Sequence, residues 1–426
     1  MWIIQRFGGF MTKKEFRQAM LKGQGRCIQA VKAAPEKYRS EVLWACSHEL
    51  AFDPQCEGSR AWYVYQMICC YEDSAPFLRV LIKTLEAVPA WKDWKMLYLA
   101  EILKYFADDG DAAALQSIRN KYDELYAMLS ARKRCPNRYF FERGSFEWLC
   151  VLLADRKRNA VKIADDIGAL LRKEAVFDFW DFDYFCWSVS KYMPTLEARA
   201  AESENIRLFL DCRRKRDQAE AERKRGSSHR NKETQQTFIG DYLNEKDPEK
   251  RTKDLRKFLF SGFSADPAPV IDDTQSDHEM LRNTAWRVLA KTKESSVRAY
   301  AMEQLSAGVE DALSVLIGNF QPEDEQMLVH QVLSLKVDRD CTTGWHSVQS
   351  DVLRMADAGV KAPQVLLWHI YESSYCSCCR ANAVRQLGKR RHLPKDTLEE
   401  CQFDSNGDIR DYAAKLLRRR NNKKGE

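Results

Sequence analysis

The stretch DIRDYAAKLL, residues 408–417, is one of four copies of a short pattern in the C-terminal part of the chain. Each copy has an apolar residue or a cysteine, then an arginine, and further along an alanine and a leucine. On an α-helix of about 3.6 residues per turn, the alanine and the leucine share one stripe, and the small alanine lets a neighbouring helix come close. The pattern therefore predicts helices that stack. Its members are Arg282, Arg298, Arg380 and Arg410, then Ala285, Ala301, Ala383 and Ala413, then Leu289, Leu305, Leu387 and Leu417.

The arginine of each copy is expected to have a structural role. Its guanidinium can donate hydrogen bonds to the preceding turn or pair with an acidic residue of the next repeat. Residues 326–333 have the same spacing with glutamine and valine in place of arginine and alanine, which indicates a degenerate copy. Ser276 and Glu279 have the spacing of a capping box and predict a helix start before the first copy.

The composition is typical of a helical protein. Among 426 residues, 45% are hydrophobic and 31% are charged, and there are only 18 Gly and 12 Pro. Apolar residues recur at helical spacing from Lys13 to about Pro194, and strand-like alternation is scarce. A chain of this length fits two or three domains or one elongated array. We therefore expect an all-α protein, a helical array or α-solenoid with repeats in its C-terminal part.

The polarity of the sequence changes in the middle of the chain. Residues 196–236 contain one short apolar segment and are otherwise almost wholly polar, so most of this stretch cannot bury an apolar face. The sequence therefore predicts three parts. They are an aromatic-rich helical domain over 1–200, a charged linker or exposed helix over 201–236, and repeats with a basic tail over 237–426.

Two stretches carry an excess of positive charge on a chain whose net charge is +6. Residues 205–232 have ten basic against four acidic residues, and residues 385–424 have twelve against six. One interpretation is a solvated connector and tail; the other is a surface that attracts a polyanion. The candidate polyanion-binding residues are Arg213, Arg214, Lys215, Arg216, Arg223, Lys224, Arg225, Arg418, Arg419 and Arg420.

The N-terminal half holds most of the tryptophans. They are expected to fill the space between stacked helices, where large rings bury much apolar area. The alternative is an aromatic-lined groove for a peptide or a base, since concave faces of helical arrays bind extended partners. The candidate groove aromatics are Trp62, Trp91, Trp94 and Trp180.

The four copies resemble HEAT repeats, in particular the short bacterial type, whose second helix often carries an acidic or amide residue, then Val-Arg, then alanine and leucine. Residues 404–417 are the closest copy, and residues 294–305 are the next. Arg282 and Arg298 are only 16 residues apart, which departs from the family and predicts that one of them lies on a first helix. The resemblance covers about residues 277–417 and implies an α-solenoid that binds proteins, or less often nucleic acid.

The HEAT-like proteins that this chain resembles include one group of enzymes, the alkylpurine DNA glycosylases. These enzymes use tryptophan, aspartate and arginine on a basic concave surface. Their catalytic set cannot be matched here residue by residue. The sequence also has no Gly-rich phosphate loop, no Gly-x-Ser-x-Gly and no His-Glu-x-x-His. An enzyme is therefore the less favoured interpretation, and we assign no catalytic residue.

One group of cysteines has some metal-ligand character. Cys376, Cys378 and Cys379 are crowded at one helix start, with His392 and Cys401 further on, whereas structural zinc needs four convergent ligands. We expect these residues to pack as small side chains, and we assign no metal ligand and no cofactor. Fourteen cysteines without an export signal or a membrane-spanning run predict a reducing cytoplasm.

These observations favour a non-catalytic scaffold that binds a protein partner through its helical array, with no membrane association. The alternative is a nucleic-acid-binding repeat protein that uses the basic stretches 205–232 and 385–424. A glycosylase-like activity is a remote third hypothesis.

Overall fold

The computed structural model describes residues 11–89, 93–131, 140–173, 182–226, 235–337, 339 and 344–422. These residues form α-helices and short 3₁₀ turns, and no strand occurs among them, so the predicted all-α class is confirmed. Within the same residues, none of the helices combines the length and apolar character that crossing a bilayer requires.

The chain folds into two compact units. The N-terminal unit comprises residues 1–229 together with 399–410, and the C-terminal unit comprises 230–398 together with 411–426. This division differs from the predicted one in two places. Most of the predicted linker, residues 201–229, belongs to the N-terminal unit, and so does a short piece of the predicted repeat domain, residues 399–410.

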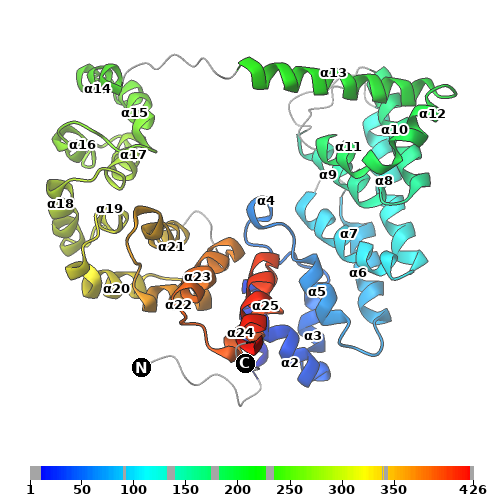
Figure 1. Ribbon diagram of the computed structural model, residues 1–426, viewed down its shortest axis with the longest axis horizontal. Helices are drawn as coiled ribbons and strands as arrows, with labels where there is room; N and C mark the ends of the chain where they lie inside the picture. The colour runs from blue at the N-terminus through cyan, green and yellow to red at the C-terminus, as the bar shows by residue number, and fades with distance from the viewer. Residues whose placement is uncertain are drawn as a thin grey trace. The chain divides into compact units, whose positions relative to one another are not determined.

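The N-terminal unit is a series of helices that pack on their near neighbours in the chain (Figure 1). One row of contacts joins α1, α3, α5, α7, α9 and α11, and a second row joins α6, α8, α10 and α12. The helices are α1 Lys13–Lys22, α2 Arg26–Ala33, α3 Pro35–Ala45, α4 Pro54–Glu57, α5 Ala61–Ile68, α6 Ala75–Ala87, α7 Asp93–Asp108, α8 Ala112–Ser130, α9 Phe140–Leu153, α10 Lys157–Arg172, α11 Phe182–Ser188, α12 Met193–Arg199 and α13 Glu204–Gly226.

Helix α13 contains the charged stretch that was predicted to be a linker or an exposed helix. Its first turns pack against α10, with Ile206 and Phe209 buried, and Figure 1 shows it as one long helix. The helices come close at Gly168, where a Cβ atom would lie 1.9 Å from the Asn205 carbonyl oxygen. The short apolar segment of the sequence therefore anchors the helix, and its polar remainder continues beyond that contact.

Residues 399–410 pack on the first helices of the N-terminal unit. The Arg26 guanidinium lies 2.8 Å from the buried Glu400 carboxylate, and the backbone N–H of Ser405 donates to the Gly23 carbonyl at 2.9 Å. Glycine is required at Gly25, because a Cβ atom there would lie 2.0 Å from the Glu400 carbonyl oxygen. Sequence periodicity could not reveal this contact, since it joins segments nearly 400 residues apart.

The C-terminal unit repeats the same arrangement of contacts. One row joins α15, α17, α19, α21 and α23, and a second contact joins α20 to α22. The helices are α14 Gln235–Asn244, α15 Pro248–Leu255, α16 Ala268–Asp273, α17 Glu279–Leu289, α18 Ser295–Ser306, α19 Ala312–Gly318, α20 Glu325–Ser334, α21 Gly344–Arg354, α22 Gln364–Ser373 and α23 Ser377–Lys389. The boundary between the units falls within α24 Lys395–Cys401 and α25 Gly407–Asn422.

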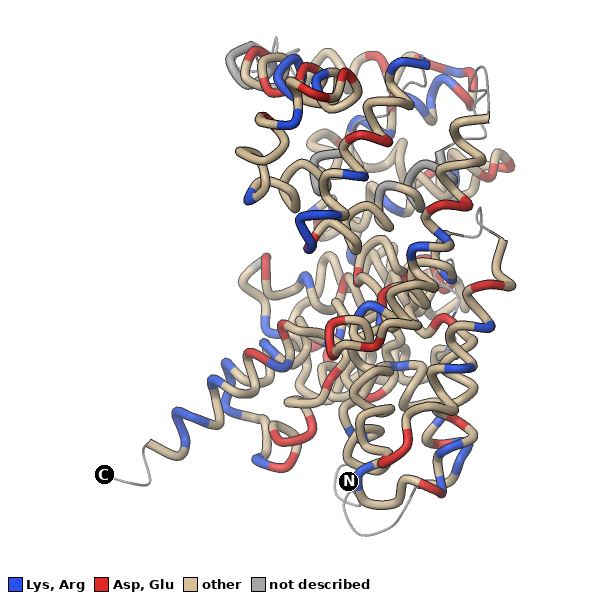
Figure 2. The backbone as a smooth tube through the Cα atoms, turned by 90° about the vertical axis from the view of Figure 1, so that its right-hand side faces the viewer, with Lys and Arg blue, Asp and Glu red and all other residues tan. Residues whose placement is uncertain are grey.

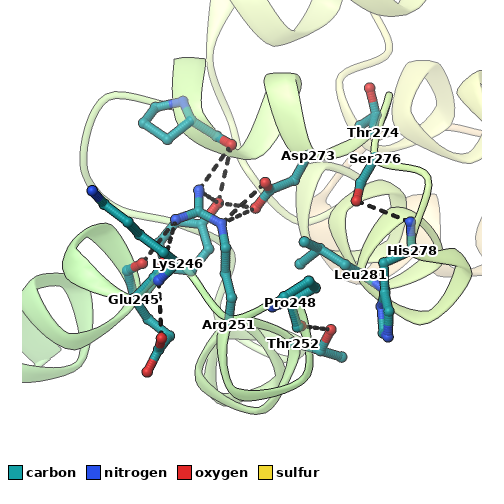
Figure 3. A network of polar contacts seen from close by, with 12 residues as sticks. Glu245, Lys246, Pro248, Arg251, Thr252, Asp273, Thr274, Ser276, His278 and Leu281 are labelled. Carbon is teal, nitrogen blue, oxygen red and sulfur yellow. Dashed lines mark hydrogen bonds and ion pairs between the residues drawn. The ribbon is translucent and has the colours of Figure 1, made fainter.

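Arg251 joins the first helices of the C-terminal unit (Figure 3). Its Nε lies 2.8 and 3.0 Å from the two carboxylate oxygens of Asp273, and its Nη1 donates to the carbonyls of Tyr242 and Glu245. The Tyr242 hydroxyl also donates to Asp273, at 2.6 Å. Because every partner of this guanidinium lies in α14, α16 or the turn before α15, a single side chain fixes three helix ends.

Two local predictions in the C-terminal unit are wrong. The residue that caps α17 is His278, whose Nδ1 accepts from the Leu281 N–H at 3.3 Å, while the Ser276 hydroxyl accepts from the His278 N–H (Figure 3). The proposed capping box of Ser276 and Glu279 is therefore absent.

The degenerate copy on α20 is also out of phase with the other four. Its leucine, Leu333, is 43% exposed, whereas Leu328 and Val332 are fully buried. Asp324, just before the helix, is held by Arg298 and lies on the same stripe as Leu328 and Val332. This anchor accounts for the rotation of α20, which turns the expected Val329 and Leu333 stripe away from the core.

We expect Gly168→Ala to destabilise the N-terminal unit by roughly 1–3 kcal/mol, because the added methyl group would overlap the Asn205 carbonyl and force α10 and α13 apart. Gly240→Ala is the matched control, since Gly240 lies within α14 and a Cβ atom there would meet nothing within 4 Å. Thermal unfolding followed by circular dichroism measures both. Equal midpoints for the two variants would contradict the close contact.

Candidate functional site

The arginines of the repeated pattern make both kinds of contact that the sequence suggested. Arg282 donates to the Ser276 carbonyl at 2.7 Å, and Arg410 donates to the Asp404 carbonyl at 2.7 Å, so each binds the turn before its own helix. Arg298 instead pairs with Asp324 before α20, with Nε 3.0 Å from the carboxylate, and this hydrogen bond raises the pKa of Arg298. Arg380 is completely buried.

The alanines and leucines of the pattern form the contact stripes. Ala285, Ala301, Ala383 and Ala413 are all 0% exposed, which is the state expected where a second helix approaches closely. Three of the leucines are buried, and Leu417 is partly buried. Arg282 and Arg298 lie on the consecutive helices α17 and α18, as their short spacing predicted. These residues hold neighbouring helices together, and none of them alone is a site.

The helices of the C-terminal unit leave an open groove with a volume of about 970 Å³. It lies where helices end and begin: α17, α19 and α21 end there, and α18 begins there. Apolar side chains of Ile317, Phe320, Met355 and Val360 line it, together with Phe260. Sequence periodicity does not reveal this site, because its residues come from separate turns whose proximity no periodicity encodes.

Phe260 is the most unusual residue of the groove. Its ring is 96% exposed, although phenylalanine normally buries most of its surface. It lies just after a 3₁₀ turn that ends at the buried Phe258, so the chain buries one aromatic ring and presents the next one outward. An exposed aromatic ring at the edge of a groove is typical of a surface that a partner covers.

The charges of the groove are balanced. Four basic residues, Lys291, Lys293, Arg298 and Arg354, and four acidic residues, Glu294, Glu323, Asp351 and Asp357, line it. Several already pair with each other: Arg298 with Glu323 at 3.2 Å, and Asp351 with Lys291 at 3.8 Å and Arg354 at 3.9 Å. This arrangement suits a surface of mixed polarity and gives a polyanion no excess of positive charge to bind.

Lys293 differs from the other groove cations, because no acidic side chain among the described residues pairs with it. Its amino group donates instead to the Gly318 carbonyl at the end of α19. Burial and the nearby charge of Lys291 lower the pKa of Lys293. A carboxylate brought by a partner would favour the charged form of Lys293 and so offset the lowering of its pKa. The groove therefore offers an apolar surface next to a cationic group that a negative charge would stabilise.

Two of the four candidate groove aromatics, Trp62 and Trp94, lie in the described residues. The Trp62 ring faces Arg410, whose guanidinium lies 3.6 Å from the ring centroid, so that face is covered within the N-terminal unit. Trp94 is 38% exposed on α7. Trp91 and Trp180 lie outside the described residues. The predicted aromatic groove thus has no support from the two rings that can be placed.

The candidate polyanion-binding residues are partly engaged by the chain itself. Arg213 lies 3.8 Å from Asp217, Arg214 pairs with Asp211, and Arg420 donates to the Leu393 carbonyl at 2.7 Å. Arg418 and Arg419 are exposed on α25, and Figure 2 shows basic residues following one another along this last helix. Lys215 is exposed on α13 and Arg216 is partly buried there; the side chains of Arg223, Lys224 and Arg225 lie outside the described set.

The cysteines at the start of α23 lie beside a histidine that the spacing of the sequence did not reveal. His346, Cys376 and Cys379 bring one ligand atom each to within 4.8 Å of one another, and Nε2 of His346 lies 3.7 Å from Sγ of Cys379. Hydrogen bonds from the Cys378 and Cys379 thiols lower the pKa of Cys376. His392 and Cys401, which follow these cysteines in the sequence, are not members of the cluster.

Comparisons with known proteins give the chain no family. No family model matches it, and no curated protein matches it. Among solved structures, a crystal structure of an engineered protein is 12% identical over 95% of this chain and 94% of that chain, with a TM-score of 0.26. A likeness at this level carries no argument, so the resemblance to HEAT repeats stays a prediction.

We expect Arg298→Ala to lower the free energy of unfolding by roughly 1–3 kcal/mol, because it leaves the buried Asp324 carboxylate without its charged partner. Arg287→Ala removes an exposed arginine from α17 and is expected to change stability by less than about 0.5 kcal/mol. Denaturant unfolding of both variants measures the difference. If Arg298→Ala unfolds like Arg287→Ala, the structural role of the pattern's arginine is wrong.

Proposed function

We propose that the protein is a non-catalytic α-solenoid scaffold of HEAT-like repeats that binds a protein partner in the groove of its C-terminal unit. Two features support the solenoid. Helices contact near neighbours in rows of alternate elements in both units, and the four alanines of the pattern are buried. The observation that carries the binding role is the exposed Phe260 ring at a groove of about 970 Å³.

The chemistry of the groove indicates the kind of partner. Ile317, Phe320 and Met355 would receive an apolar side chain, and Lys293 would receive a carboxylate. A protein segment that carries an apolar residue next to an acidic one satisfies both. Arg298 pairs with Glu323, and Asp351 pairs with Lys291 and Arg354. The four basic and four acidic residues of the groove therefore give no excess of positive charge, which favours a protein segment over a phosphate backbone.

Photocrosslinking in the native cell tests this proposal. A photoreactive phenylalanine analogue is placed at position 260 in the groove and, as the matched control, at position 333 on α20, where Leu333 is exposed outside the groove. We expect one protein to crosslink at position 260 and not at position 333. Lys293→Glu in the same background should reduce that product on the order of tenfold, the effect of losing roughly 1.4 kcal/mol of binding energy.

Equal crosslinking at positions 260 and 333, or the same yield with and without Lys293→Glu, would contradict a groove-specific partner. Nucleic acid crosslinked at position 260 would instead favour the alternative function.

The alternative, a nucleic-acid-binding repeat protein, draws on Arg418 and Arg419, which remain exposed on α25. We expect the purified chain not to bind a random DNA duplex even at about 50 mM salt, where release of counterions favours association. Fluorescence anisotropy measures this. Tight binding that weakens steeply with salt, and less steeply after Arg418→Ala and Arg419→Ala, would contradict the scaffold proposal.

A further inference from the structure

We propose that His346, Cys376 and Cys379 bind one zinc ion that joins α21 to α23. The three side chains come from two helices that pack on each other, and their ligand atoms lie within 4.8 Å of one another. A metal ion at the centre of such a group can reach all three, because bonds from zinc to sulfur and nitrogen are about 2.0–2.3 Å long.

The types of ligand select the metal. Two cysteine thiolates and one neutral imidazole are soft ligands that zinc accepts, whereas calcium and magnesium prefer oxygen ligands. Cys376 and Cys379 are also separated by two residues, the spacing that lets two sulfurs reach one ion. The sequence pointed to these cysteines, but His346 lies 30 residues earlier and only the fold brings it to them.

The local structure favours a metal-bound form of both cysteines. Cys376 is the N-cap residue of α23 and Cys379 lies in the first turn, where the backbone N–H groups of a helix start stabilise negative charge on sulfur. Ser350, one turn after His346 on α21, places its hydroxyl 3.9 Å from the Cys379 sulfur. The same hydroxyl donates to the His346 carbonyl at 2.9 Å, so the backbone of one proposed ligand holds Ser350 beside the sulfur of another.

The main competing explanation is a redox pair, because two cysteines separated by two residues at a helix start also occur in disulfide exchange sites. Exchange requires a thiol that another protein can reach. Cys376 and Cys379 are only 4% and 8% exposed, and the His346 ring lies against Cys379. Burial with an imidazole in contact therefore favours a metal that is taken up during folding.

Three ligands leave one coordination position to fill. Cys378, which is exposed and lies between the two cysteine ligands in the chain, is one candidate. A water molecule is the other. Neither changes the three ligands that carry the proposal.

The test measures metal in the purified full chain, produced in medium that contains zinc. We expect about one zinc per chain, as structural sites hold their ion tightly. His346→Gln and Cys379→Ser should each lower the zinc content at least about tenfold. The matched controls His392→Gln and Cys56→Ser alter an exposed histidine and an exposed cysteine elsewhere, and should keep it.

Cobalt substitution of the unaltered chain gives a measurement that does not depend on variants that fold. A tetrahedral cobalt spectrum with sulfur charge-transfer bands is expected. A change of this spectrum in Cys378→Ser identifies Cys378 as the fourth ligand, whereas an unchanged spectrum indicates water. The proposal is overturned if zinc remains below about a tenth of an equivalent after zinc is added, since a preformed thiolate site binds tightly. It is also overturned if the control variants lose as much zinc as His346→Gln, or if mass spectrometry finds Cys376 and Cys379 joined as a disulfide.

Discussion

The structure depends on helices that approach closely at small residues. Ala285, Ala301 and Ala383 are completely buried, and at Gly168 a single added carbon would overlap a neighbouring carbonyl. A helix with one narrow apolar stripe buries that stripe only when its neighbour reaches the backbone beside it. Helices that do so contact mainly the elements next to them in the chain, as both units show.

The sequence predicted this constraint well because it is periodic. The stripes, the all-α class and the contacts of Arg282 and Arg410 with the turns before their own helices follow from residues close together in the chain. Two predictions failed for different reasons. Asp324, held by Arg298 from 26 residues away, shares the buried stripe of α20, and His278 takes the place of the expected cap of α17 within the same turn. The contact of Glu400 with Arg26 joins distant segments, and spacing could not predict it.

Both candidate sites lie at helix ends and in the turns between helices. The groove forms between helix ends, and Phe260 and Lys293 come from turns. The thiol cluster joins the start of α23 to the first turn of α21. The one sequence signal for it was the crowding of Cys376 and Cys379; nothing in the sequence marked His346 as their partner. Loops held by a rigid array are where such side chains can meet, since the helix faces themselves are occupied by packing.

Amide hydrogen exchange across the full-length chain tests the close-packing account most directly. Opening a helix that is held by its neighbours costs more free energy than fraying a solvated one, so exchange ranks the helices by their packing. The account predicts that amides near Ala285, Ala301 and Ala383 exchange among the slowest of the described residues, far more slowly than those in the polar second half of α13. If amides in both places exchange at similar rates, burial of the alanine stripe is not what holds the array together.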